Sequence, residues 1–426
     1  MSRLSAPALA ILVACGDASA TPESTETTAQ ATTAQATTDS GAATPGDSSD
    51  GPASSTTDVT ITPTTSSAGT TDSSTTTMDA STSEDTSTTG EPAKCTPVSP
   101  TASAVCVEGR QLLVGRRDGG VLAPVQPYRI AGVCWAPTGV GEANTQGYAD
   151  YYVQYGGADA PHFQSLGANT IKTYDPFAQT PAALAVLDDL HSRGIMVAMS
   201  VIVYHGDAGP KNYLAAVNYF KGHPAILMWI VGNEFNYNNM YGAPDLDAAT
   251  AIVNEAIAQI HAADPDHPVA VGHGEVPTPE RYMAVPDADI WAVNLYPNLD
   301  LESRFVAWPG LSDKPMFVSE YGADAFNNGI GQEDQASQAD ATETLTLQIF
   351  ANLSADDPDL ACLGGTIYAL TDEWWKAEGP IDQHDNGGFP GAIHPDGFAN
   401  EEWWGLMDVQ RTPRLAFSAL QAIYTQ

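Results

Sequence analysis

Basic side chains are scarce in this sequence of 426 residues. Lysine and arginine together number 16, against 52 aspartates and glutamates, and the formal net charge is −36. A protein that binds nucleic acid or an anionic lipid surface through its own side chains usually presents an excess of positive charge. The composition therefore argues against nucleic acid, anionic lipid and polyanionic substrates as partners, whereas a neutral polymer is compatible with it.

Long hydrophobic runs are also missing from most of the chain. Met1–Cys15 carries a short apolar stretch behind one arginine, which is typical of an export signal and too short to span a bilayer. Its last four residues, LVAC, resemble the lipobox of bacterial lipoproteins, which implies that Cys15 becomes a lipid-bearing N-terminus. We therefore expect an exported cell-envelope lipoprotein, at the outer membrane or cell surface, that meets membrane only through this lipid anchor. A plain signal peptide on a secreted protein is the alternative.

Aromatic residues are absent from Asp17 to Pro92, where Thr, Ser, Ala, Asp and Pro dominate and TTAQATTAQATT forms a short repeat. Such a stretch cannot bury enough apolar surface to offset the entropy lost on ordering. We predict a disordered tether over residues 16–94 and a folded domain over residues 95–426. The tether would hold the domain at a distance from the anchoring surface.

Cysteine is rare, with five in the whole chain. If Cys15 is lipidated, four remain, and four cysteines permit three pairings. Cys95 and Cys106 would close a small loop where the folded domain begins. Cys134 and Cys362 are expected on the first and last strands of that domain, where they could pair or stay as buried thiols. No spacing of Cys and His resembles a zinc site, and we predict neither metal nor cofactor.

The folded domain alternates apolar runs with helical patterns. The apolar runs are Tyr128–Trp135, Thr170–Tyr174, Ile195–Tyr204, Ala225–Phe235, Pro268–Gly272, Ile290–Tyr296, Pro315–Tyr321 and Leu363–Leu370. The helical patterns are Pro181–Arg193, Leu246–Ala263, Thr342–Leu353 and Pro413–Tyr424, with short candidates at Pro279–Ala284 and Leu301–Ala307. Eight strands alternating with helices predict a (β/α)8 TIM barrel. A doubly wound sheet is the alternative, but no glycine-rich phosphate loop follows the first strand.

A small hairpin at Val107–Ala123 is expected ahead of the barrel, covering its bottom. The opposite rim, at the carboxyl ends of the strands, is where barrel enzymes gather their chemistry. The fourth run, AILMWIVGNEF, ends there in Asn233 and Glu234, and the seventh, PMFVSEYG, ends in Glu320. Two glutamates on these strands can face each other across the mouth. Glycoside hydrolysis with retention needs such a pair about 5–5.5 Å apart, with one carboxyl protonated and the other ionised.

The motifs GNE and SEYG, in this order and on these strands, resemble the two signatures of retaining (β/α)8 glycoside hydrolases of clan A. That group includes β-glucanases, β-mannanases, β-galactosidases and β-1,3-glucanosyltransferases. The segment LGANTIKTYDP resembles the second strand of the β-1,3-glucan-active members, and WWGLMDVQRTPRLAFSAL resembles the closing segment of many members. The resemblance covers roughly Pro127 to Tyr424.

The resemblance implies roles for residues at three strand ends. Glu234 would be the general acid/base, and Glu320 the nucleophile that forms a glycosyl-enzyme intermediate. Asn233 would bind the 2-hydroxyl of the sugar, in a bond that tightens in the transition state. Tyr296 would orient Glu320 and hold it ionised.

Further substrate contacts are expected around this centre. Trp374, just past the eighth strand, would form the floor beneath the sugar whose bond is cut, with Trp375 as the alternative. Tyr174 and Lys172 end the second strand, and His205 follows the third. Many members carry arginine near the position of Lys172, and lysine keeps the charge but lacks the bidentate fork, so Lys172 either supports the nucleophile or forms an ordinary ion pair.

The sequence thus predicts a monomeric retaining glycosidase or transglycosylase, without cofactor, acting on a β-glucan or related neutral β-linked carbohydrate. Hydrolysis and transfer use the same catalytic residues and differ only in whether water or a sugar hydroxyl reaches the intermediate. Two alternatives stay open. One is a catalytically silent carbohydrate-binding lipoprotein, and the other is a hydrolase that inverts the anomeric centre.

Overall fold

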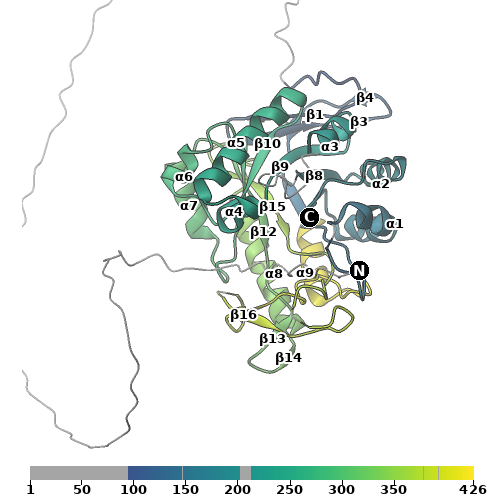
Figure 1. Ribbon diagram of the computed structural model, residues 1–426, viewed down its shortest axis with the longest axis vertical. Helices are drawn as coiled ribbons and strands as arrows, with labels where there is room; N and C mark the ends of the chain where they lie inside the picture. Colours follow the sequence, from purple (N-terminus) through teal and green to yellow (C-terminus); the bar gives the residue numbers. More distant parts are fainter. Residues whose placement is uncertain (1–94, 146, 202–212, 378, 392) are drawn as a thin grey trace, which may run out of the picture. The chain divides into compact units, whose positions relative to one another are not determined.

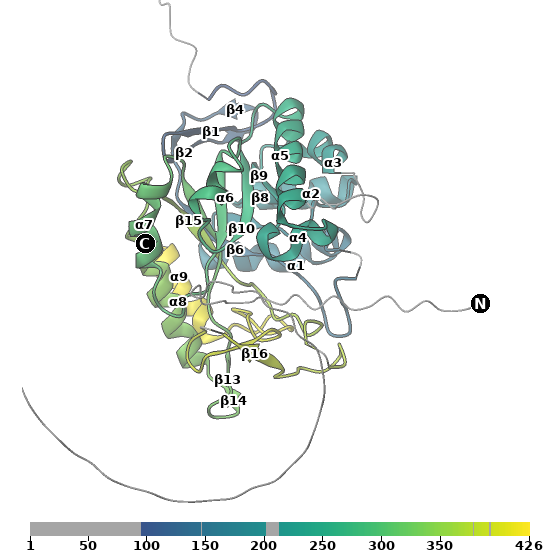
Figure 2. The same cartoon turned by 60° about the vertical axis from the view of Figure 1, so that its left-hand side comes forward.

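Eight parallel strands close into a barrel in the computed structural model of the chain (Figures 1 and 2). The structure describes residues 95–145, 147–201, 213–377, 379–391 and 393–426. Around the barrel the strands are β6 (Ile130–Cys134), β7 (Thr170–Lys172), β8 (Met196–Val201), β9 (Ile226–Val231), β10 (Val269–Gly274), β11 (Ile290–Asn294), β12 (Met316–Tyr321) and β15 (Cys362–Ile367). β15 pairs in parallel with β6 and completes the ring. The predicted (β/α)8 barrel is confirmed.

The barrel strands form from continuous apolar runs because both of their faces are covered. Every residue of β9 and of β12 is buried, as expected for parallel strands packed between an inner core and an outer layer of helices. The expectation that the fourth strand continues to Phe235 is wrong. Gly232 and Glu234 adopt positive φ angles of 72° and 50°, which interrupt the extended backbone, and Phe235 begins a helix.

The helices of the described residues surround the strands. They are α1 (Ala149–Leu166), α2 (Pro181–Ser192), α3 (Tyr213–Phe220), α4 (Phe235–Gly242), α5 (Leu246–Ala263), α6 (Pro279–Met283), α7 (Glu302–Leu311), α8 (Gln335–Phe350) and α9 (Leu415–Tyr424). The predicted cap of α2 is present, since the Thr180 side chain accepts a hydrogen bond from the backbone N–H of Ala183. α8 begins earlier than predicted, because Asp334 caps it and the side chain of Gln338 in its first turn is buried although it is polar.

A small antiparallel sheet closes the bottom of the barrel. It contains β1 (Ala104–Glu108), β2 (Gln111–Gly115) and β5 (Gln126–Pro127), and β3 (Arg117–Asp118) pairs with β4 (Val121–Leu122) beside it. Val105, Leu112 and Val114 pack in one buried cluster with side chains from the barrel strands, among them Ile130 and Leu227. The short pairs β13 (Phe326–Asn327) with β14 (Gln332–Glu333) and β16 (Gly388–Pro390) with β17 (Phe398–Asn400) lie at the opposite end (Figures 1 and 2).

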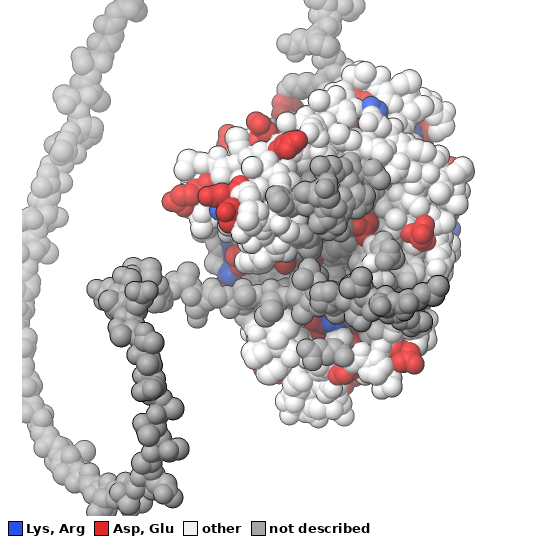
Figure 3. Space-filling model, in the orientation of Figure 1, with Lys and Arg blue, Asp and Glu red and all other residues white. Residues whose placement is uncertain are grey.

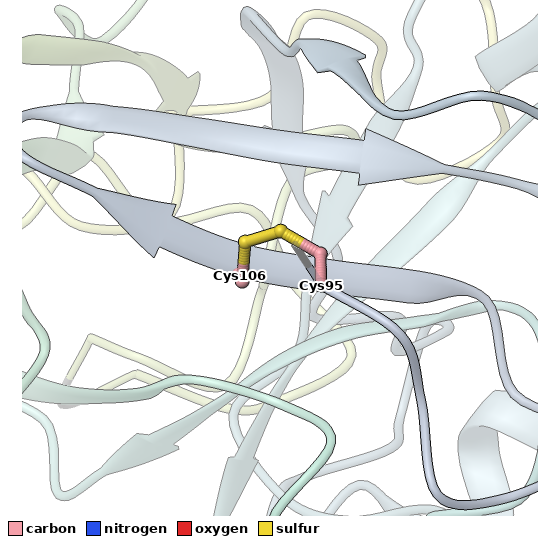
Figure 4. The surroundings of a disulfide bond; sticks show 2 residues. All are labelled: Cys95 and Cys106. Carbon is pink, nitrogen blue, oxygen red and sulfur yellow. A yellow bond between two sulfur atoms is a disulfide. The ribbon is translucent and has the colours of Figure 1, made fainter. Parts of the chain in front are cut away.

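The cysteines of the folded domain take two forms. Cys95 and Cys106 form a disulfide that ties the start of the domain to β1 (Figure 4). Cys134 and Cys362 are buried free thiols. Their strands are neighbours, as expected, but Cys134 ends β6 while Cys362 begins β15. Because the two strands run parallel and Gly364 lies beside Ile130, the thiols are about six residues apart along the strands, roughly 20 Å at 3.3 Å per residue, and cannot pair.

Several sequence predictions lie outside the described residues. They are the export signal and Cys15, the tether over residues 16–94, and His205. Within the described part of the chain, none of the helices is long and apolar enough to cross a membrane.

Candidate active site

Two buried carboxyl groups meet at the carboxyl ends of the barrel strands. Glu234 follows β9 and is 6 % exposed, and Glu320 lies near the end of β12 and is 7 % exposed. The negative charge of Glu320 raises the pKa of Glu234 (after the larger effect of burial), so the two groups are close enough to interact. Asn294, which ends β11 beside β12, donates from Nδ2 to Glu234 Oε1 at 3.1 Å. The backbone of Glu234 is left-handed, which turns the chain sharply from strand into helix α4.

Glu320 accepts hydrogen bonds from three side chains. Lys172 Nζ donates to Oε1 at 2.7 Å, Tyr174 OH donates to Oε1 at 2.8 Å, and Tyr296 OH donates to Oε2 at 2.9 Å. Burial alone would raise the pKa of Glu320, but the charge of Lys172 and the hydrogen bonds from Lys172 and Tyr174 outweigh it and lower that pKa below its usual value. Glu320 is therefore ionised at neutral pH and held by partners on two other strands.

Glu234 has the opposite electrostatic environment. Burial and the charge of Glu320 raise the pKa of Glu234 to about 7, while the bond from Asn294 and the charge of Lys172 oppose this rise. The two carboxyl groups thus have pKa values displaced in opposite directions. Such a pair provides one proton donor and one carboxylate nucleophile at the same pH.

Asn233 is fixed beside the two glutamates. Its Oδ1 accepts from Lys172 Nζ at 3.1 Å and from Asn294 Nδ2 at 3.2 Å. Asn294 is itself held, because its Oδ1 accepts from Ser319 Oγ at 2.7 Å. With Oδ1 occupied, the amide of Asn233 offers N–H donors to a ligand, which suits an interaction with a sugar hydroxyl.

The structure brings most of the predicted site residues together. Lys172, Tyr174 and Tyr296 all contact Glu320. Lys172 forms an ion pair with that carboxylate, and both partners are buried. Trp374 packs against a second set of ring side chains in the described part of the chain. Its ring stacks on His384 with centroids 4.9 Å apart, and His384 stacks in turn on Trp403 at 3.5 Å.

Tyr368 is an active-site aromatic that the sequence did not reveal. It directly follows β15 and is buried. Its ring contacts Tyr174 and Trp404, with centroids 6.2 Å and 5.7 Å apart, and Trp404 also contacts Tyr296 at 5.1 Å. Tyr368 could have been selected from the sequence, because it is the only aromatic residue of the apolar run Leu363–Leu370. The larger tryptophan side chains that follow this run were selected instead.

A second charged group lies at the same end of the barrel. Lys376 Nζ is 3.4 Å from Glu373 Oε2 and 3.5 Å from Glu401 Oε2. Glu373 also accepts from the hydroxyls of Tyr148 and Tyr368. Glu401 follows β17 and gave no sequence signal, because its place beside Lys376 depends on how the last loops fold over the barrel. In the described part of the chain, no group of three or more His, Cys, Asp or Glu side chains is arranged to hold a metal ion.

The part of the chain that carries this site is similar to known glycoside hydrolase barrels. Residues 211–350, which contain both glutamates, match the TIM barrel domain of glycosyl hydrolases family 2. The β-glucuronidase of Rattus norvegicus is 27% identical over 233 residues, which cover 49% of this chain and 33% of that protein. The chain thus spans about a third of the length of this relative. Both glutamates therefore lie in a segment that is similar to a glycosidase barrel.

Solved structures share the fold. Bifidobacterium dentium β-glucuronidase superimposes with a TM-score of 0.52 and 18% identity, covering 76% of this chain and 49% of that chain. Saccharomyces cerevisiae Gas2p in complex with laminaripentaose gives a TM-score of 0.50 and 14% identity, covering 76% and 70%. At these identities the likeness shows the architecture and leaves the substrate open.

Proposed function

We propose that this protein is a retaining β-glycosidase or transglycosylase in which Glu320 is the nucleophile and Glu234 the general acid/base. The supporting observation is the pair of buried carboxyl groups at the ends of β9 and β12 with pKa values displaced in opposite directions. A barrel that only bound carbohydrate would have no need for a carboxylate held ionised beside one held protonated.

In the first step of this mechanism, Glu234 gives its proton to the glycosidic oxygen while Glu320 attacks the anomeric carbon. The bond to the leaving group breaks and a glycosyl ester with Glu320 forms. In the second step, Glu234 removes a proton from water or from a sugar hydroxyl, which attacks the same carbon and releases Glu320. Two inversions give net retention. Lys172, Tyr174 and Tyr296 orient the carboxylate of Glu320 and stabilise its charge in the free enzyme.

The proposed substrate is a neutral β-linked carbohydrate, with β-glucan preferred. The cations described near the site are already matched: Lys172 pairs with Glu320, and Lys376 lies between Glu373 and Glu401. Figure 3 shows Asp and Glu spread over the visible face of the folded domain, with few Lys or Arg. A polyanionic substrate would meet repulsion on approach and in the site.

A β-glucuronide is the second candidate, because the sequence relative described above is a β-glucuronidase. The two candidates differ in the charge of the group at C6 of the sugar. The proposed setting is the cell envelope, with Cys15 as lipid anchor, and this part rests on the sequence of Met1–Cys15 alone.

The test is a digest of a panel that contains β-glucans of different linkage, β-mannan, and the 4-nitrophenyl β-glucoside and β-glucuronide, with product lengths measured. We expect cleavage of a neutral member, and products longer than the substrate would show transfer. Binding to a member of the panel without any turnover would instead support the silent carbohydrate-binding barrel. Proton NMR of the first product distinguishes retention from inversion, and an inverted anomer would refute the double displacement.

The pH dependence of kcat/KM should follow the two glutamates. Glu234 acts as an acid and must be protonated, so activity is expected to fall as the pH rises through about 7. Glu320 must be ionised, so the acid limb should lie below the usual pKa of a glutamate. The measurement is kcat/KM from about pH 3 to 10, a range that includes carboxyl groups with ordinary and with raised pKa values.

Lys172→Met provides the control for this profile. Removing the charge beside Glu320 should raise the pKa of that carboxyl and move the acid limb to higher pH. Lys172→Arg keeps the charge and should leave the acid limb closer to that of the wild type. The pKa of Glu234 is about 7, so kcat/KM should fall between about pH 7 and 9. A kcat/KM that stays constant over this range would contradict the assignment of Glu234, because a protonated acid would then not be required.

A further inference from the structure

The charged group around Lys376 combines a buried side and an open side. The Glu373 side chain is 2% exposed and accepts from the hydroxyls of Tyr148 and Tyr368. The side chains of Lys376 and Glu401 are 17% and 25% exposed. Glu373 is therefore buried and holds Lys376 in place, while the side chains of Lys376 and Glu401 remain partly exposed.

This group lies beside the two catalytic glutamates. The Tyr368 hydroxyl accepts from Lys376 Nζ, and the Tyr368 ring contacts the ring of Tyr174, which donates to Glu320. After larger contributions from burial and closer partners, the charge of Lys376 lowers the pKa of Glu320, and that of Glu401 raises the pKa of Glu234. Because such interactions weaken with distance, both charges are near the reacting centre.

The position of the group around the barrel indicates which part of a sugar it meets. Tyr368 and Lys376 follow β15, which lies opposite β9 in the ring of eight strands, and Asn233 follows β9. A pyranose with C1 at the glutamates and its 2-hydroxyl at Asn233 directs C4 and C5 toward the opposite wall, since C5 lies across the ring from C2. The 4-hydroxyl and the C6 substituent then point toward Lys376 and Glu401.

We propose that Lys376 and Glu401 bind the 4-hydroxyl and 6-hydroxyl of the sugar that is cleaved, and thereby select a neutral glycoside over a uronide. The ammonium of Lys376 donates to a hydroxyl oxygen, and the carboxylate of Glu401 accepts from a hydroxyl group. The inference rests on the proposed glycosidase function and adds the substrate class to it.

The same pair disfavours a carboxylate at C6. Such a group would share one ammonium with Glu373 and Glu401, which already lie 3.4 Å and 3.5 Å from Lys376 Nζ. Burial lowers the pKa of Lys376, but the charges of these two glutamates raise it overall, so the positive charge of Lys376 is already balanced by its neighbours. A third carboxylate would add repulsion in a partly buried site, where charges are poorly screened.

Glu401→Gln and Lys376→Met test the proposal. We would measure kcat and KM for the 4-nitrophenyl β-glucoside, its 4-deoxy and 6-deoxy analogues, and the β-glucuronide. Each variant should lose roughly 10- to 100-fold in kcat/KM on the glucoside, the range of a charge-assisted hydrogen bond. The loss should be much smaller on the analogue that lacks the bound hydroxyl, because residue and hydroxyl form one interaction. Glu401→Gln should also raise the glucuronide-to-glucoside ratio of kcat/KM roughly tenfold or more.

Glu343→Gln is the matched control, because Glu343 is an exposed glutamate on α8 and its change should leave all rates unaltered. Wild-type activity on the panel distinguishes failure of the proposed glycosidase function from failure of the recognition pair alone. An inactive wild type would refute the proposed function and this inference together. An active wild type that prefers the glucuronide, or whose variants keep their rate on the glucoside, would overturn only the recognition pair. If Lys376→Met leaves Glu373 uncompensated and fails to fold, Glu401→Gln carries the test alone.

Discussion

Glu320→Ala is expected to abolish turnover, by roughly 10⁴-fold or more in kcat, while the barrel stays folded. In the proposed mechanism this side chain supplies the atom that bonds to the anomeric carbon, and no other described carboxylate receives the same three hydrogen bonds from Lys172, Tyr174 and Tyr296. Steady-state kinetics on the best substrate of the panel measures the loss, and circular dichroism with a thermal melt measures the fold.

Azide makes this prediction specific for a nucleophile. In Glu320→Ala the space left by the carboxylate can admit azide, which attacks the anomeric carbon once and gives a glycosyl azide of inverted configuration. Glu320→Gln keeps the size of the side chain and covers the case that an unpaired Lys172 destabilises the alanine variant. Residual kcat above about one per cent of wild type in a folded variant would remove Glu320 from the nucleophile role.

Glu234→Ala should lower activity by about 10²- to 10⁴-fold on a natural glycan, the range for loss of general acid/base catalysis. The cost should depend on the leaving group. A 2,4-dinitrophenyl glycoside departs without a proton, so formation of the intermediate should be nearly unaffected and a burst of phenolate is expected. The basic limb of the pH profile near 7 should disappear, because Glu234 is the group whose raised pKa produces it.

Rescue by azide again distinguishes the role. In Glu234→Ala, azide needs no base to attack the intermediate held on Glu320, so the product should be a glycosyl azide of retained configuration. The two variants are thus expected to give opposite anomers from the same reagent. A product of the same anomeric form from both, or an equal loss of rate on good and poor leaving groups, would mean that the two roles are wrongly assigned.

The strands of the barrel were predictable because the local sequence of each strand is enough to identify it. A continuous apolar run can be recognised without knowing its neighbours, and α5 occupies the predicted range Leu246–Ala263. Helices with mixed signals were not predictable. α1 contains Gly156, Gly157 and Pro161, which lower helix propensity and hide a long helix. α4 was missed because it begins directly after the strand and turn that carry Glu234.

The residues of the candidate site also fall into a group that could be predicted from the sequence and a group that could not. Glu234 and Glu320 could be selected from sequence because each ends an apolar run at the rim of the barrel. The aromatic neighbours could not be ranked, since the contacts of Tyr368 and Trp374 depend on how the loops after β15 return over the mouth. For the same reason Glu401, from a later loop, was not expected beside Lys376.

The sequence by itself determined the barrel, the order of its strands and the two glutamates on the fourth and seventh of them, because strand patterning and strand-end carboxylates are local properties. The family resemblance assigned different roles to the two glutamates, but only the tertiary structure showed the contacts that lower the pKa of Glu320 and raise that of Glu234. That difference comes from burial and from charges brought together from distant parts of the chain, such as Lys172 at 2.7 Å from Glu320. The tertiary structure also placed Lys376 between two carboxylates. The energy of such a buried charge depends on spatial neighbours that no local pattern specifies.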